Sequence, residues 1–398
     1  MSLQALPQSV LRIIVEYVTD VETLCSLDST CRDLHDVTRE EAVWVALWQR
    51  TWQRGSALCG SAREEFKRRY LIDNEVMKYV SRLNRTTEQL PMLYAVSQVM
   101  SNGCEAMDIC WRLWKCHKNQ ETRKYARGFL RLLLCGSVCA DMKRTLNDED
   151  NTDRTPGERL EDACILTTTM FQPVSCTNFQ DTAKENVKVK LQQIADSIKI
   201  QFTSEMSIKT KLKIVDEAFF HQEHTCFSGN VQNYYDYRNS LLDVSLDRRK
   251  AIPMTLALLY KFICHRLDIL VEVVGLPGHI VVHVPALARF VDVFEGGRHL
   301  SVADCINIVN QYGFPMQDSY LSPLPPELIV QRILNNLENC LVRNPSIQRP
   351  ASARQRAAIT ALRAVASEPN SEQLDECRHL LVLTWTSEAC VGTDISDW

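Results

Sequence analysis

Residues 251–297 read AIPMTLALLYKFICHRLDILVEVVGLPGHIVVHVPALARFVDVFEGG, and this stretch decides the fold class of the C-terminal half. From about Ile252 to Leu267 apolar residues occur on nearly all sides of the expected helix, which predicts that this helix is buried. Short runs rich in β-branched residues follow at 270–274, 279–284 and 290–294. The turn residues between and after these runs are Gly275, Pro277, Gly278, Gly296 and Gly297. A helix beside short antiparallel strands predicts an α+β unit.

The rest of the chain carries helical periodicity, at 62–145, at 158–200 and after Pro326. Residues 147–156, NDEDNTDRTP, are acidic and polar with nothing to bury, so we expect a linker there. The expected fold is therefore mainly α with one α+β domain. The expected parts are a three-helix module at 1–52, a helical linker domain at 53–146, an acidic linker at 147–157, the α+β domain at 158–320, and a helical, repeat-like C-terminal tail at 321–398.

Composition narrows the class of partner. The chain has 398 residues, of which 45% are hydrophobic and 24% charged, with a net charge of -4. These values are typical of globular proteins. No basic field favours nucleic acid or an anionic membrane, and no window approaches the ~20 apolar residues of a membrane span. Because the N-terminus lacks a secretory signal pattern, the expected location is the cytosol, the nucleus or both.

The sixteen cysteines include no CxxC pair, so neither a zinc ribbon nor a redox dithiol is indicated. We expect reduced thiols that serve as small core residues. The nearest approach to a metal cluster is the trio His221, His224 and Cys226. Without a second ligand pair this trio is a weak metal signal, and no metal or other cofactor is expected.

Residues 6–52 predict a small helical docking module. Pro7 stands at the start of a helix, where its missing N–H costs nothing. Two further short helices follow, and tryptophans then recur at i, i+4 and i+8, at positions 44, 48 and 52. A unit of ~50 residues buries little core. We therefore expect it to gain stability from a partner.

The Leu6-Pro7 opening, the hydrophobic first helix and the Cys31-Arg32 pair resemble the F-box pattern. This resemblance implies docking onto the Skp adaptor of a cullin-RING ubiquitin ligase, with an apolar helix stripe laid into a groove. The residues implied in Skp binding are Leu6, Pro7, Val10, Leu11, Ile14, Tyr17, Leu24, Leu27, Cys31 and Leu34. The alternative is a helical cap whose apolar face packs on residues 60–100 of the same chain.

A second, more specific set of spaced residues is similar to the transglutaminase-like domain of the bacterial SirB family, over roughly residues 155–385. The matching motifs include Tyr234-Tyr235-Asp236, Arg249, Ile252-Pro253, Pro277-Gly278-His279, Asp292, Gly296-Gly297 and Arg332-Ile333-Leu334-Asn335-Asn336-Leu337. In this order the two modules resemble the eukaryotic family of F-box only protein twenty-one. That family usually has a further C-terminal domain similar to a hemimethylated-DNA-binding protein. The sequence up to Trp398 lacks it, so we expect a divergent homologue or a shorter product.

The transglutaminase-like resemblance implies a Cys-His-Asp triad. His279 and Asp292 match the family's histidine and aspartate, but Pro253 stands at the nucleophile position at the start of the central helix. Cys264 lies 11 residues further along this helix, about 16 Å away, which is too far to replace it. We therefore expect no catalysis. The His279–Asp292 pair then either pins two strands by a hydrogen bond or lies in a pocket that binds a ligand.

The expected function is that of a substrate-recognition subunit of a Skp–cullin–F-box ubiquitin ligase. The partners implied are the Skp adaptor, the cullin-RING ligase and an unknown protein substrate. Two alternatives stay open: a cysteine hydrolase or transferase with a relocated nucleophile such as Cys226 or Cys305, which sequence cannot place, and a scaffold unrelated to ubiquitin.

Overall fold

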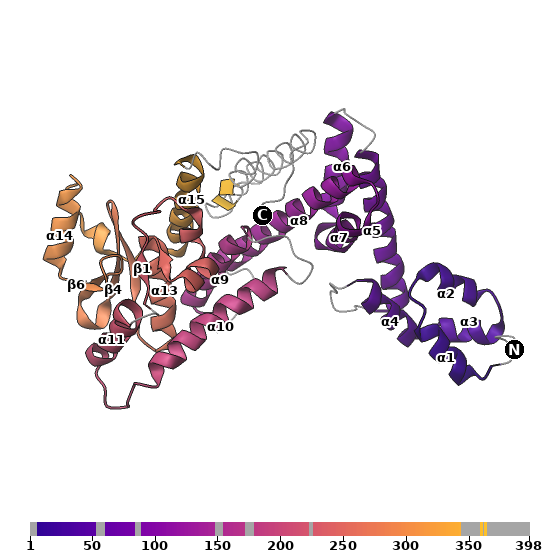
Figure 1. Cartoon of the computed structure of the whole chain (residues 1–398), viewed down its shortest axis with the longest axis horizontal. Coiled ribbons are helices and arrows are strands. Elements are labelled where there is room, and N and C mark those ends of the chain that lie inside the picture. The colour runs from indigo at the N-terminus through magenta and orange to yellow at the C-terminus, as the bar shows by residue number, and fades with distance from the viewer. Residues whose placement is uncertain are drawn as a thin grey trace. The chain divides into compact units, whose positions relative to one another are not determined.

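The computed structural model describes residues 6–52, 60–83, 89–147, 154–171, 179–222, 226–343, 359–360 and 362–363. The described residues up to 134 form one compact unit and those from 135 onward form another, with the boundary inside α8 (Gln120–Asn147). The fold is mainly helical with one small sheet region, as the sequence predicts (Figure 1). No helix within these ranges is both long and apolar enough to cross a membrane.

The described part of the first unit is entirely helical. Asp20 accepts a hydrogen bond from the backbone N–H of Thr23 at 2.7 Å and so caps the second helix. Pro7 is the N-cap of the first helix, one position before the expected one. Besides α8, the helices are α1 (Gln8–Glu16), α2 (Val21–Asp28), α3 (Arg32–Thr38), α4 (Glu41–Thr51), α5 (Ala62–Leu83), α6 (Gln89–Ser101), the 3-10 turn η2 (Gly103–Glu105) and α7 (Ala106–Cys116).

The four short helices α1–α4 complete their core on the start of α5. Leu11, Leu24 and Leu34 are fully buried in this core. Phe66 of α5 joins it, and its ring centroid lies 5.4 Å from that of Trp44 and 4.7 Å from that of Trp52. Part of the module's apolar surface is therefore covered by its own chain, as the packing alternative expects.

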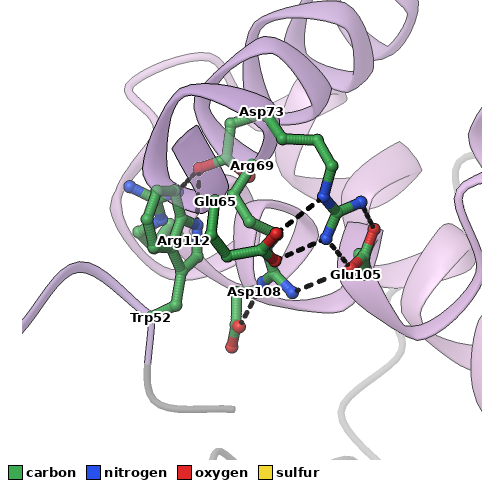
Figure 2. A network of polar contacts seen from close by, with 8 residues as sticks. Trp52, Glu65, Arg69, Asp73, Glu105, Asp108 and Arg112 are labelled. Carbon is green, nitrogen blue, oxygen red and sulfur yellow. Dashed lines mark hydrogen bonds and ion pairs between the residues drawn. The ribbon is translucent and has the colours of Figure 1, made fainter. Parts of the chain in front are cut away.

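A buried polar network holds the end of α4 against α5 and α7 (Figure 2). Trp52 donates its indole N–H to Asp73 at 3.0 Å, and Arg112 of α7 also pairs with Asp73. The nearby guanidinium of Arg69 lies over the Trp52 ring at 5.3 Å and pairs with Asp108 at 3.1 Å. Removing one partner of such a buried pair typically costs about 3–5 kcal/mol, so the network fixes the three helices relative to one another.

The second unit contains the predicted buried helix, α13 (Pro253–Arg266), and the predicted strands. Gly275 lies inside a strand instead of the turn, because it pairs with Ile280. The helices are α9 (Pro156–Thr169), α10 (Phe179–Lys199), α11 (Ile208–Asp216), the π-helical turn η3 (Glu217–His221), η4 (Tyr237–Ser240), α12 (Leu242–Arg248), η5 (Pro285–Leu287), α14 (Val302–Gln311), η6 (Asp318–Leu321) and α15 (Pro326–Arg343). The strands are β1 (Ser228–Gly229), β2 (Lys250–Ala251), β3 (Glu272–Leu276), β4 (His279–Val284), β5 (Arg289–Asp292) and β6 (Arg298–Leu300), of which β1, β2 and β6 were not predicted from the sequence.

Strands β3 to β6 form an antiparallel sheet in chain order. Because side chains alternate across a strand, Val281 and Phe290 share one face, and both pack against Cys305 of α14. Val282 and Val291 share the opposite face, and α13 packs against β3 and β4. The sheet thus lies between α13 and α14 (Figure 1).

Two expected segments fall largely outside the described residues. Within the acidic linker, 148–153 are not described, while Thr155 and Glu158 form a capping box that begins α9. Within the C-terminal tail, α15 is described, but 344–358, 361 and 364–398 are not. The repeat-like character expected of this tail therefore stays a prediction.

Candidate functional site

The candidate site begins where α13 starts. Pro253 is the first residue of α13 and is half-buried, and β2 just before it pairs with β1. The ring of Phe294 presses so closely on Gly229 of β1 that a Cβ there would overlap it. Phe294 in turn donates its backbone N–H to Asp292 Oδ1 at 3.1 Å. These contacts link Asp292, through Phe294 and β1, to the strand β2 that precedes α13.

His279 and Asp292 form the hydrogen bond expected from the sequence, with 2.8 Å between Nε2 and Oδ2. Asp292 Oδ1 also accepts the backbone N–H groups of Phe294 and Glu295. Burial opposes ionisation of Asp292, but His279 and the two N–H donors hold its pKa below the ordinary value. Since an ionised carboxylate only accepts, His279 Nε2 donates, and Nδ1 is the ring atom left to accept a proton.

No cysteine sulfur in the described part of the chain lies within hydrogen-bond distance of His279. Cys264 is buried in α13, and burial raises the pKa of its thiol. Cys305 of α14 is also buried, which raises the pKa of its thiol to about 11. A neutral buried thiol is a poor nucleophile, so neither cysteine is poised for attack here. Cys226 is half-buried, and no hydrogen bond among the described residues joins it to the pair.

An aromatic surface, made of Tyr234, Tyr235, Phe294 and Tyr312, lies beside this pair. The Tyr234 ring lies edge-on to Tyr235, with centroids 5.3 Å apart, and to Phe294, at 6.3 Å. Tyr312 lies over Gly278, next to His279, where a Cβ would be 2.6 Å from its ring. The three tyrosines are exposed. Exposed aromatic groups of this kind are enriched at protein recognition sites.

Arg332 of α15 is a further candidate that lies near the β3–β4 hairpin. Its guanidinium occupies the space above Gly275, where a Cβ would be 2.8 Å from it. Burial lowers the pKa of this guanidinium, and no carboxylate in the described ranges pairs with it. A half-buried cation with free donors suits an anionic group of a ligand. The sequence singled out Arg332 only as a family match.

Sequence reasoning missed a second His–Asp pair. Asp216 accepts hydrogen bonds from His299 Nε2 and from the hydroxyl of buried Tyr260, both at 2.7 Å. Burial raises the pKa of Asp216 despite these two donors. The three residues join β6, α11 and α13, so their role is to hold the helices on the sheet. Because they are up to 83 positions apart, no local spacing signals the contact.

The docking residues divide into three groups by burial: buried, exposed and half-buried. Leu11, Leu24 and Leu34, which the sequence assigns to the adaptor surface, are buried in the module's own core and offer no contact surface in this conformation. The exposed apolar groups of α1 are Val10 at 37%, Ile13 at 55% and Tyr17 at 78%. Ile13 was not predicted. Of the remaining docking residues, Pro7 is exposed and Leu6, Ile14, Leu27 and Cys31 are half-buried.

No group of three His, Cys, Asp or Glu within the described ranges is arranged to hold a metal ion. His224 of the weak trio lies outside the described residues, so that trio is not tested.

The His279–Asp292 bond makes a pH-dependent contribution to stability. A carboxyl whose pKa is lowered by folding stabilises the fold above its ordinary pKa and loses that effect as pH falls through the folded value. We expect the protection factors of the Phe294 and Glu295 amides, which compare the measured exchange rate with the intrinsic rate at the same pH, to fall on acidification below about pH 4. In an Asp292→Asn variant these amides should exchange faster at pH 7, and the difference from wild type should shrink toward pH 3. An unchanged difference would contradict the assignment.

Comparison with known proteins covers part of the chain. Residues 185–335 match the family described as the transglutaminase-like superfamily. A UPF0162 protein of Xylella fastidiosa (strain 9a5c) is 32% identical over 153 residues, which are 36% of this chain and 53% of that protein. A UPF0162 protein of Pseudomonas aeruginosa is 34% identical over 103 residues, 25% of this chain and 38% of the relative.

F-box only protein 21 of Homo sapiens is 26% identical over 121 residues, 28% of this chain and 19% of that protein. The chain thus spans about half the length, or less, of these relatives. No solved structure matches. The chain contains a transglutaminase-like domain at residues 185–335 and is homologous, over part of its length, to UPF0162 proteins and to F-box only protein 21.

Proposed function

We propose that this chain is the substrate-recognition subunit of a Skp–cullin–F-box ubiquitin ligase, active in the cytosol or nucleus. The module α1–α4 docks on the Skp adaptor, and the transglutaminase-like domain captures the target protein. The ligase's RING and E2 subunits carry out ubiquitin transfer. Partial similarity to F-box only protein 21 supports this assignment.

The observation that carries the proposal is the exposed face of α1. Val10, Ile13 and Tyr17 follow one another at i, i+3 and i+7, which places them on one side of the helix. The interior of the same module is already filled by Leu11 and Val15. An apolar stripe left over after the core is complete fits a partner's groove.

The second unit supports recognition instead of catalysis. Pro253 stands where the resemblance places the nucleophile, and it carries no group that can attack. His279 is nevertheless held in one orientation by Asp292, beside the exposed aromatic surface. We propose that target residues bind over this surface and that Arg332 receives an acidic group of the target.

Binding to purified Skp adaptor tests the proposal directly. The triple variant Val10→Ala, Ile13→Ala, Tyr17→Ala removes the apolar stripe and spares the core. We expect its affinity to fall about 100-fold or more, because buried apolar side chains at an interface centre contribute about 1–3 kcal/mol each. Isothermal titration measures the dissociation constant.

The matched control removes three exposed apolar side chains elsewhere in the same unit, with Leu71→Ala, Met77→Ala and Tyr94→Ala, which are 61%, 41% and 59% exposed in wild type. This control should bind like wild type. If wild type does not bind, or if both triple variants bind equally well, adaptor docking through α1 is wrong.

The oriented imidazole of His279 favours a second candidate, a cysteine hydrolase or transferase with a relocated nucleophile. A thiol-reactive probe would then label one cysteine of the wild-type chain in a His279-dependent manner. If the adaptor binds but loss of the protein stabilises no ubiquitinated client, a scaffold unrelated to ubiquitin is favoured instead.

A further inference from the structure

Two tryptophans at the end of α7 form a platform beneath a lysine. The indole rings of Trp111 and Trp114 lie nearly perpendicular, at 88°, with centroids 4.9 Å apart. The ammonium group of Lys115 lies 4.8 Å from the first centroid and 4.2 Å from the second. Both rings are half-buried and Lys115 is exposed. The rings therefore hold a cation at the surface in a fixed place.

Positive charge is concentrated around this platform. Residues 111–127, WRLWKCHKNQETRKYAR, contain six Lys or Arg and one acidic residue, in a chain whose net charge is -4. Arg112 pairs with Asp73, and Lys124 pairs with Glu121. No carboxylate of the described residues lies within ion-pair distance of Lys115 or Lys118, both of which are exposed.

Local structure adds to the positive charge of this region. Arg123 donates from Nε to the backbone carbonyl of Trp114 at 2.9 Å, which anchors its guanidinium beside the platform. Asn119 caps α8 through a 3.0 Å bond from the backbone N–H of Thr122. The N-terminus of this long helix thus begins at the patch and carries partial positive charge. We call Trp111, Trp114, Lys115, Lys118 and Arg123 the basic patch.

The arrangement distinguishes between two anionic partners. Proteins that hold single-stranded nucleic acid stack bases on open aromatic faces. Here Lys115 lies over both indoles, and Arg127 lies over Trp114 at 5.3 Å, so a base would have to displace a cation to stack. A carboxylate needs no such displacement, because it can approach the same cations from the solvent side. Charge complementarity therefore favours an acidic protein segment.

We propose that the basic patch binds an acidic peptide segment of a partner protein. Its carboxylates pair with Lys115, Lys118 and Arg123, and an apolar side chain of the segment lies along the indole edges. This interaction does not depend on adaptor docking through α1 or on the transglutaminase-like domain.

Fluorescence anisotropy of a labelled twelve-residue glutamate peptide with one central leucine tests the proposal on the full chain. We expect saturable binding that weakens as salt is raised from 50 to 300 mM, because exposed charges are screened. The variant Lys115→Glu, Lys118→Glu, Arg123→Glu should weaken binding at least about tenfold. The control variant Lys67→Glu, Lys78→Glu, Lys143→Glu makes the same charge change at exposed lysines elsewhere and should bind within about twofold of wild type.

Circular dichroism checks that each variant is folded. If the triple variant is unfolded, the milder double variant Lys115→Gln, Lys118→Gln replaces it in the binding measurement. Equal loss in the patch and control variants would show that only net charge matters and would overturn the proposal. So would the absence of saturable peptide binding. Tighter binding of a twelve-nucleotide thymidine strand than of the peptide would assign the patch to nucleic acid instead.

Discussion

Replacing Gly297 with alanine is expected to lower the unfolding free energy of the second unit by about 2–5 kcal/mol. Gly297 has a φ of 79°, in the region where a Cβ meets the backbone. The ring of Phe220 also covers it so closely that an added Cβ would overlap the ring. Backbone strain and overpacking therefore act together at this position.

The neighbouring glycine provides the control. Gly296 has a similar φ of 67°, but a Cβ there would meet nothing within 4 Å. Gly296→Ala should lower the free energy of unfolding only through backbone strain, by about 1–2 kcal/mol. The free energy of unfolding of both variants is measured by chemical denaturation, with hydrogen exchange of the β4 and β5 amides as the probe. Equal losses would show that the Phe220 contact is unimportant, whereas a Phe220→Ala change that rescues Gly297→Ala would confirm the contact.

This contact matters to the candidate site. Gly297 donates its backbone N–H to the carbonyl of Asp292 at 2.9 Å and so closes the turn after β5. Phe220 belongs to the π-helical turn η3, and its ring also stacks on Tyr260 of α13, with centroids 5.7 Å apart. The position of Asp292 therefore depends on packing between elements that are distant in sequence.

The sequence predicted those parts of the site whose contacts are local. The resemblance singled out His279 and Asp292, and the turns and β-rich runs beside them made their approach plausible; they lie 13 residues apart on neighbouring strands joined by a short connection. Asp216, Tyr260 and His299 were missed because nothing in their separate segments indicates that the three meet. Arg332 above Gly275 is a contact of the same kind.

For the docking module the sequence predicted the helices, but it did not predict which face of each helix is buried. Helix α1 contains Leu11, Ile13, Ile14 and Val15 in close succession, so its apolar side is broader than one packing face. Periodicity cannot then decide which side faces inward. Packing against α3 and α4 decides it, and it buries Leu11 and leaves Ile13 exposed.

Replacing Pro253 with cysteine tests whether the transglutaminase-like site lacks only its nucleophile. A thiol at the first position of α13 would meet the partial positive charge of the helix N-terminus, which lowers a thiol pKa. Because His279 Nε2 is bonded to Asp292, Nδ1 is the ring atom that would take the proton. We expect iodoacetamide to alkylate Cys at 253 at least about tenfold faster at pH 7 than an ordinary exposed thiol, measured by peptide mass spectrometry.

Two internal comparisons make this result decisive. Cys264 and Cys305 are buried thiols with raised pKa values, so they should react slowly in every variant. Adding His279→Ala to Pro253→Cys should remove most of the enhancement, because the imidazole can no longer take the proton. If the rate stays high without His279, the helix alone activates the thiol and the His279–Asp292 pair only pins its strands. If the Pro253→Cys thiol is no faster than an ordinary one, the pair is not aimed at the start of α13. If wild type itself shows one cysteine whose labelling depends on His279, the alternative of a hydrolase or transferase with a relocated nucleophile is favoured over the recognition role of this domain.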